Sequence, residues 1–153
     1  MKHLLALLIL PVVACAPASS GTGASQPQPN TLASGDAVAA RAFTLTPLGA
    51  GNRVAGRVET ALQPNGSTRL TNAASGLSGS SAHAAHIHSG SCARPGAIIV
   101  VLSEVSADAS GDALTNTMVD TARIPQSAYV MVHQRDSSAA NGPGPGLACA
   151  NIR

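Results

Sequence analysis

Three of the chain's five histidines lie within six residues, in the segment HAAHIHSGSC (83–92), and a cysteine ends that segment. Side chains alternate between the two faces of a β-strand, so His86 and His88 would point the same way and could chelate one metal ion. The third ligand would then be His133, the other histidine of the region that we expect to fold. Three neutral imidazoles suit copper or zinc better than hard cations, which prefer oxygen. The alternative is that HAAHIH is a polar loop and that His133 ends a strand in solvent.

The segments around these histidines have the pattern of short β-strands. RAFTLTPL, NRVAGRVET and AYVMVHQ alternate apolar and polar residues, and PNGS is a typical hairpin signal. About eight such runs are separated by clusters of Gly, Pro, Asn and Ser, and helical periodicity is almost absent. The sequence therefore predicts an antiparallel, all-β sandwich or barrel that positions the histidines.

The start of the chain, MKHLLALLILPVVACA, predicts a secretory signal over residues 1–15. Its apolar run is too short to span a bilayer as a mature helix. VVAC resembles the lipobox of bacterial lipoproteins, which implies that Cys15 is lipidated and that the protein is extracytoplasmic, membrane-anchored, and either periplasmic or on the cell surface. A plain signal peptide that is cut slightly later is the alternative. Residues 16–37 predict a flexible tether, because they are rich in Ala, Ser, Gly, Pro and Gln, and residues 38–153 predict one folded domain.

The charge and the cysteines agree with an exported binding protein. The net charge is +2 with 10% charged residues and no Lys/Arg cluster, which excludes nucleic-acid binding. Membrane contact is expected only through the lipid anchor. Once Cys15 is accounted for by lipidation, Cys92 and Cys149 remain, and two such cysteines in an exported protein most often form a disulfide.

The extracellular copper/zinc superoxide dismutases are the family that these motifs resemble. The similar segments are GLSGSSAHAAHIHSGSC, LSEVSADASGDA, YVMVHQRD, GPGLACANI and the N-terminal FTLTPLGAGNRVAGRV. The resemblance covers nearly all of the expected domain and implies an eight-stranded Greek-key β-sandwich or barrel of the superoxide dismutase type. It also implies roles for individual residues: one copper on His86, His88 and His133, a disulfide between Cys92 and Cys149, and a His83 that orients the site through backbone hydrogen bonds without binding metal.

The sequence departs from this family at two places. No histidine lies between His88 and His133, where the family carries its bridging histidine and zinc ligands, and Val101 stands where the zinc aspartate would be. Gly146 occupies the position of the family's guiding arginine, whose charge attracts superoxide. We therefore expect one copper per chain and no zinc, without the usual anion path or proton carrier.

The sequence leaves three functional hypotheses. The first is an exported, superoxide dismutase-like copper-binding protein with weak or no dismutase activity and a role in copper handling or oxidative defence. The second is an active copper-only superoxide dismutase, in which Arg94 or Arg135 replaces the missing arginine. The third is a metal-free structural domain, because the chordin-type (CHRD) domain also has an AHIH motif and a late histidine. A hydrolase has no support, since no serine has a nucleophile-elbow context.

Overall fold

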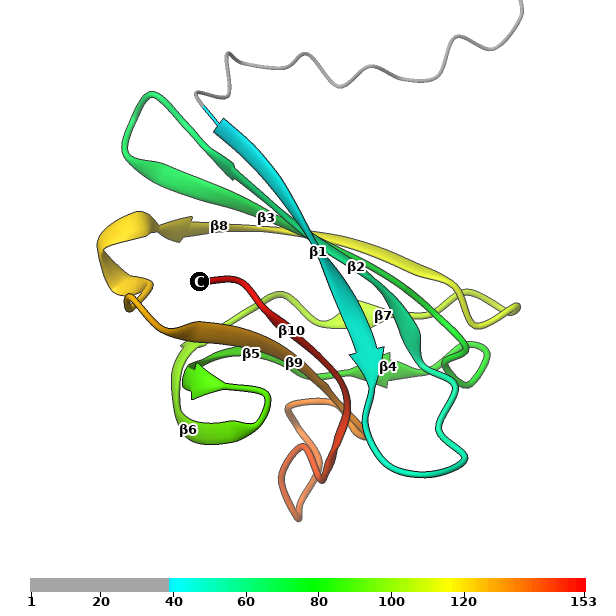
Figure 1. Ribbon diagram of the computed structural model, residues 1–153. Coiled ribbons are helices and arrows are strands. Elements are labelled where there is room, and N and C mark those ends of the chain that lie inside the picture. Colours follow the sequence, from blue (N-terminus) through cyan, green and yellow to red (C-terminus); the bar gives the residue numbers. More distant parts are fainter. Residues whose placement is uncertain (1–38) are drawn as a thin grey trace, which may run out of the picture. The chain divides into compact units, whose positions relative to one another are not determined.

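Ten β-strands and one short 3-10 turn make up residues 39–153, the part of the chain that this computed structural model describes (Figure 1). The strands are β1 (Ala39–Pro47), β2 (Ala55–Leu62), β3 (Ser67–Ser75), β4 (Ala82–His83), β5 (Ala85–Ser91), β6 (Arg94–Val101), β7 (Val105–Ser106), β8 (Ala113–Asp120), β9 (Ala128–His133) and β10 (Gly146–Asn151). The 3-10 turn η1 spans Thr121–Arg123. The expected signal peptide with Cys15 and the expected tether (16–37) lie outside the described residues. No helix within residues 39–153 has the length and apolar character needed to span a membrane.

Eight of these strands form one antiparallel sheet in the order β6-β5-β9-β10-β1-β2-β3-β8, and β4 pairs with β7 separately. The sheet curls, so that the half containing β2 and β3 faces the half containing β5 and β9 (Figure 1). β9 lies beside β5 although β6, β7 and β8 intervene in the sequence, which is a Greek-key type of connection. The all-β, eight-stranded expectation is confirmed.

The core follows from the alternation of side chains along the strands. Leu45 on β1, Val58 on β2 and Leu70 on β3 are fully buried, and they meet Ile87 and Val130 from the opposite half of the sheet. Aliphatic residues provide almost all of this burial, because the chain contains one Phe, one Tyr and no Trp. The fold therefore depends on many small contacts, which makes a covalent cross-link more valuable.

The disulfide between Cys92 and Cys149 is confirmed. It joins the turn between β5 and β6 to β10, with a Cα–Cα distance of 5.9 Å. The side chain of Asn151 supports the same turn, since its Oδ1 accepts a hydrogen bond from the Cys92 N–H at 2.8 Å. These two contacts connect β10 to β5 across the intervening strand β9.

Candidate metal centre

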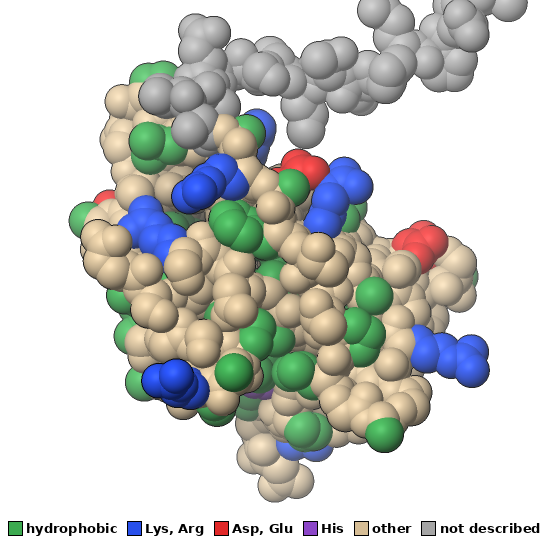
Figure 2. Space-filling model, in the orientation of Figure 1, with side chains coloured by type: hydrophobic (Ala, Val, Ile, Leu, Met, Phe, Trp, Pro, Cys, Tyr) green, Lys and Arg blue, Asp and Glu red, His purple; other side chains and the backbone are tan. Residues whose placement is uncertain are grey.

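The structure brings His86, His88 and His133 together as one buried cluster. Their ligand atoms all lie within 4.8 Å of one another. The ring centroids are separated by 4.9 Å for His86 and His133, 5.7 Å for His88 and His133, and 5.9 Å for His86 and His88. Each side chain is at most 7% exposed, and Figure 2 shows only a trace of histidine on the face drawn. The polar-loop alternative is therefore wrong.

Two neighbouring strands position these side chains. β5 pairs with β9, with His86 opposite Met131 and His88 opposite Tyr129. Register shifts before and after His88 mark irregularities in the β5–β6 pairing. The β5–β6 hairpin turns within two residues after Ser91, and Gly90 has a φ of 90°, a conformation that favours glycine. The hairpin thus leaves no long loop between His88 and the next strand.

Hydrogen bonds to backbone carbonyls fix the tautomers of two of the histidines. The Nδ1 atom of His88 lies 3.1 Å from the Gly96 carbonyl oxygen, and that of His133 lies 2.9 Å from the Gly144 carbonyl oxygen. A carbonyl oxygen only accepts, so each Nδ1 carries the proton and each Nε2 of the neutral ring keeps a lone pair. In metal-binding histidines one ring nitrogen usually donates to a carbonyl or carboxylate and the other binds the metal, and these two rings have the same hydrogen-bond pattern.

The ring nitrogens that face the cluster have no other partner. Within residues 39–153, six buried side-chain nitrogen and oxygen atoms lack a hydrogen bond, and three of them are Nδ1 of His86, Nε2 of His88 and Nε2 of His133. Buried polar atoms are normally paired, so three unpaired ring nitrogens, on side chains whose ligand atoms lie within 4.8 Å of one another, call for a bound species. That species must accept electron pairs, which is what a metal cation does.

Burial keeps two of the three histidines, His86 and His133, neutral at neutral pH. Burial, followed by the neighbouring His133 and His88, lowers the pKa of His86 from its usual value of 6.5 to about 4. Burial also lowers the pKa of His133, and its hydrogen bond to the Gly144 carbonyl partly opposes this. Imidazole binds metal in its neutral form, so both shifts favour metal binding at neutral pH.

His83 lies on β4, and its hydrogen bonds differ from those of the cluster. Its Nδ1 donates to the backbone carbonyl oxygen of His133 at 2.9 Å, and its Nε2 lies 2.6 Å from the hydroxyl of Ser81. Both ring nitrogens are therefore occupied by protein partners. The structure places His83 behind His133 as a support and not among the grouped ligand atoms.

The loop of residues 141–145 forms the rim beside His133. Besides accepting from His133, this loop receives the Arg135 side chain, whose Nε donates to the Gly142 carbonyl at 3.0 Å and whose Nη2 donates to the Asn141 carbonyl at 3.1 Å. The Arg135 guanidinium also packs against Gly144. Arg135 is thus attached to the rim, whereas Arg94 is exposed at the tip of the β5–β6 hairpin, opposite Ser91.

Gly146 pairs with His133 at the start of β10, but its side-chain position is already occupied. A Cβ placed on Gly146 would lie 2.5 Å from Met131 Sδ and 3.0 Å from Leu48 Cδ1. A larger residue at Gly146 therefore requires the flexible Met131 side chain to move. The sequence does not reveal this contact.

Tyr129 is a site residue that sequence reasoning missed. It is fully buried, and its ring stacks on His88 with centroids 4.9 Å apart and an interplanar angle of 16°. Burial raises the pKa of its hydroxyl. The signal was available, because Tyr129 is the chain's single tyrosine and shares a strand face with His133.

The cluster could hold one metal ion, and it is the one group of three or more potential metal ligands found among the described residues. Val101, at the position expected for a zinc aspartate, is an exposed residue at the end of β6. Neither models of known protein families nor curated proteins match the sequence of this chain.

Proposed function

We propose that this chain is an exported copper-binding protein, similar to the copper/zinc superoxide dismutases, that holds one copper ion on His86, His88 and His133. The observation that carries this proposal is the grouping of three buried histidines, each with a ring nitrogen that has no hydrogen-bond partner, within one cluster. Copper fits because an all-imidazole set is a borderline-soft donor set, and copper lies at the top of the divalent affinity order. A copper ion there would provide one-electron redox chemistry.

The remaining residues favour binding over rapid turnover. A dismutase needs an anion path and a proton source in addition to its metal. Gly146 provides no charge, and among the described residues no carboxylate, cysteine or fourth histidine joins the three histidines in the cluster. We infer weak or no dismutation and a role in copper handling or oxidative defence. The lipobox-like VVAC segment supports anchoring through a lipidated Cys15 on the extracytoplasmic side of a membrane, in the periplasm or at the cell surface.

An active copper-only superoxide dismutase is the second candidate, and Arg135 is the observation that favours it. Its guanidinium packs on Gly144, the residue whose carbonyl accepts the His133 proton. A cation attached to the rim beside a ligand histidine could attract a small anion toward the cluster. Arg135→Gln tests this role, and Arg94→Gln is its matched control.

The decisive experiment is metal titration followed by a superoxide assay. The metal-free chain, titrated separately with copper and with zinc, should take up one copper tightly, and His133→Gln should abolish tight uptake. His83→Gln is the control and should keep the stoichiometry, because His83 has no ring nitrogen left for a metal. Failure to bind copper would leave a metal-free, CHRD-like structural domain as the better account.

Superoxide decay coupled to xanthine oxidase then separates a binding protein from an enzyme. We expect the copper-loaded chain to be far slower than a complete copper/zinc dismutase assayed beside it. A rate near the diffusion limit, of about 10⁸–10⁹ M⁻¹s⁻¹, would favour the enzyme. In that case the rate should fall in Arg135→Gln and persist in Arg94→Gln.

A further inference from the structure

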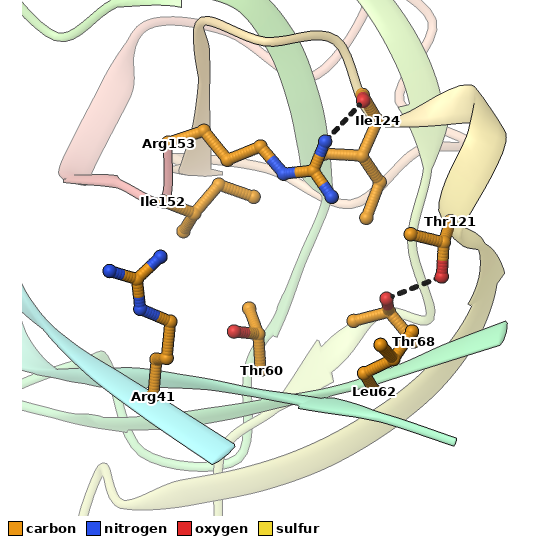
Figure 3. Close-up of a pocket in the computed structure, with 8 residues that line it drawn as sticks. All are labelled: Arg41, Thr60, Leu62, Thr68, Thr121, Ile124, Ile152 and Arg153. Atoms are coloured by element: carbon orange, nitrogen blue, oxygen red, sulfur yellow. Dashed lines mark hydrogen bonds between the residues drawn. The ribbon is translucent and has the colours of Figure 1, made fainter. Parts of the chain in front are cut away.

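A second candidate site lies where β1 and β10 separate. These two strands pair at only two positions, Thr46 with Cys149 and Pro47 with Ala148. Toward its N-terminal end β1 stays paired with β2 but leaves β10, so the curled sheet opens there. The opening exposes a cavity of about 130 Å³, lined by Arg41, Thr60, Leu62, Thr68, Thr121, Ile124, Ile152 and Arg153 (Figure 3).

Arg41 occupies a position that an apolar residue would normally fill. It has the same strand parity as Leu45, which is fully buried, and it lies directly opposite Thr60 in the β1–β2 pairing. Its side chain therefore belongs to the core-facing side of the sheet. Figure 3 shows the side chains of Arg41, Thr60 and Arg153 around the same cavity.

Arg153 brings a second positive charge to the cavity. Its Nη1 donates to the Ile124 carbonyl at 3.0 Å, which fixes the guanidinium and leaves its other N–H groups for a ligand. Within the described part of the chain neither arginine lies within 4.0 Å of a carboxylate, and the ion pair found there joins Arg57 and Glu59. Two like charges that share one cavity favour an anion between them.

The remaining residues that line the cavity indicate which uncharged groups a bound anion should carry. Leu62, Ile124 and Ile152 form an apolar surface. The hydroxyls of Thr68 and Thr121 are 2.8 Å apart and bond to each other. An inorganic anion would leave the apolar wall uncovered, whereas an amphipathic anion would cover both surfaces.

We propose that this cavity binds a small organic carboxylate with a short branched aliphatic group. Guanidinium groups bind carboxylates through paired N–H donors. The size agrees, since an apolar protein cavity of about 150 Å³ accommodates benzene, a molecule with six heavy atoms. The site is separate from the histidine cluster, because it lies where β10 ends and His133 faces the residue where β10 begins. The proposal does not depend on metal binding.

Methyl NMR on the full chain tests the proposal. The chain has six isoleucines, and two of them, Ile124 and Ile152, line the cavity. Isobutyrate should shift these two methyl signals saturably and leave buried Ile87 of the histidine strand unchanged. Isobutyramide has the same shape without the charge and should produce no saturable shift.

Substitutions then test whether the two guanidinium groups bind the carboxylate. Arg41→Gln and Arg153→Gln should each weaken isobutyrate binding about tenfold or more, because each removes charge-assisted hydrogen bonds. Both side chains are exposed, so the two variants should keep the fold. An unchanged Ile87 methyl signal in each variant would report that the fold is intact. Arg94→Gln is the matched control, since it removes an equal charge from an exposed site outside the cavity, and it should leave the affinity unchanged.

Three outcomes would overturn the proposal. The first is equal binding of isobutyramide, which would remove the role of charge. The second is an unchanged affinity in both cavity variants. The third is inorganic phosphate shifting the same methyl signals at lower concentration than isobutyrate, which would make the cavity a general oxyanion site without selection for an apolar group.

Discussion

Replacing His86 by leucine should stabilise the metal-free protein while it destroys the metal site. His86 is 4% exposed, and its Nδ1 is buried without a hydrogen bond among the described residues. Leaving such an atom unpaired costs about 1–3 kcal/mol. Leucine has a similar size and no polar atom, so His86→Leu should recover part of that free energy. A gain of about 1 kcal/mol corresponds to about 4 °C in the melting temperature of a domain of this length.

The stability gain of His86→Leu over the metal-free wild-type protein should increase at acidic pH. The pKa of His86 is lowered from 6.5 to about 4 in the folded protein, mainly by burial. Above about pH 6.5 the ring is neutral in both the folded and the unfolded chain, and no linkage applies. As the pH falls from 6.5 toward 4, the unfolded chain binds a proton that the folded chain does not bind, so the wild-type protein loses stability. The loss is about 2 kcal/mol at about pH 5 and approaches about 3 kcal/mol in stronger acid.

Thermal melts of the metal-free chains near pH 7 and pH 5 measure both effects. His83→Leu is the matched control, because both ring nitrogens of His83 are hydrogen-bonded and their loss should lower the melting temperature at either pH. Copper should raise the melting temperature of the wild-type protein and leave that of His86→Leu unchanged. If His86→Leu melts below the metal-free wild-type protein at both pH values, His86 is an ordinary core residue and the metal assignment loses its basis.

Three further predictions concern the disulfide, the pH range of copper binding and the path of the anion to the cluster. Reducing the Cys92–Cys149 bond should lower the unfolding free energy by about 4 kcal/mol in the chain-entropy model, seen as a lower melting temperature, with metal stoichiometry retained. Copper binding should persist as the pH falls below 6.5, because the pKa values of His86 and His133 are lowered. Release of copper in a pH titration with a midpoint near 6.5 would contradict this. Gly146→Arg should raise the rate of any residual superoxide dismutation, and the increase should be larger at low salt. Adding Met131→Ala should increase the gain further, because it removes the side chain that fills the space beside Gly146. Equal rates of the variant at all salt concentrations would exclude electrostatic steering.

The sequence predicted the histidine cluster in part because the spacing of His86 and His88 has a direct geometric meaning. A strand repeats every two residues, so the separation of His86 and His88 was sufficient to place them on one face. The grouping of His133 with them needed more, since it depends on β9 pairing with β5 across a Greek-key connection. Local pattern does not contain that information; His133 was predicted because it is the one other histidine of the expected domain, and the family resemblance implied the same residue.

Other features of the site depend on contacts that form only in the folded chain. The proton positions on His88 and His133 follow from the carbonyls of Gly96 and Gly144, which lie on another strand and in a loop. The packing of Met131 under Gly146 follows from the register of β9 against β10. The cavity beside Arg41 exists because β1 and β10 separate after two paired positions. Periodicity within one strand reports none of these distances.

The arrangement of the disulfide implies that the candidate metal site is formed without a metal. The disulfide joins β10 to the β5–β6 turn, and β9 lies between β10 and β5, so both strands that carry the histidine cluster are held together by the covalent bond. Carbonyl groups already orient two of the three rings. A site of this kind should bind metal without a large gain in secondary structure, unlike small domains that fold only when metal is bound. The far-ultraviolet circular dichroism of the metal-free and copper-loaded chains should therefore coincide, and a large change on loading would show that the metal, and not the disulfide, organises the strands.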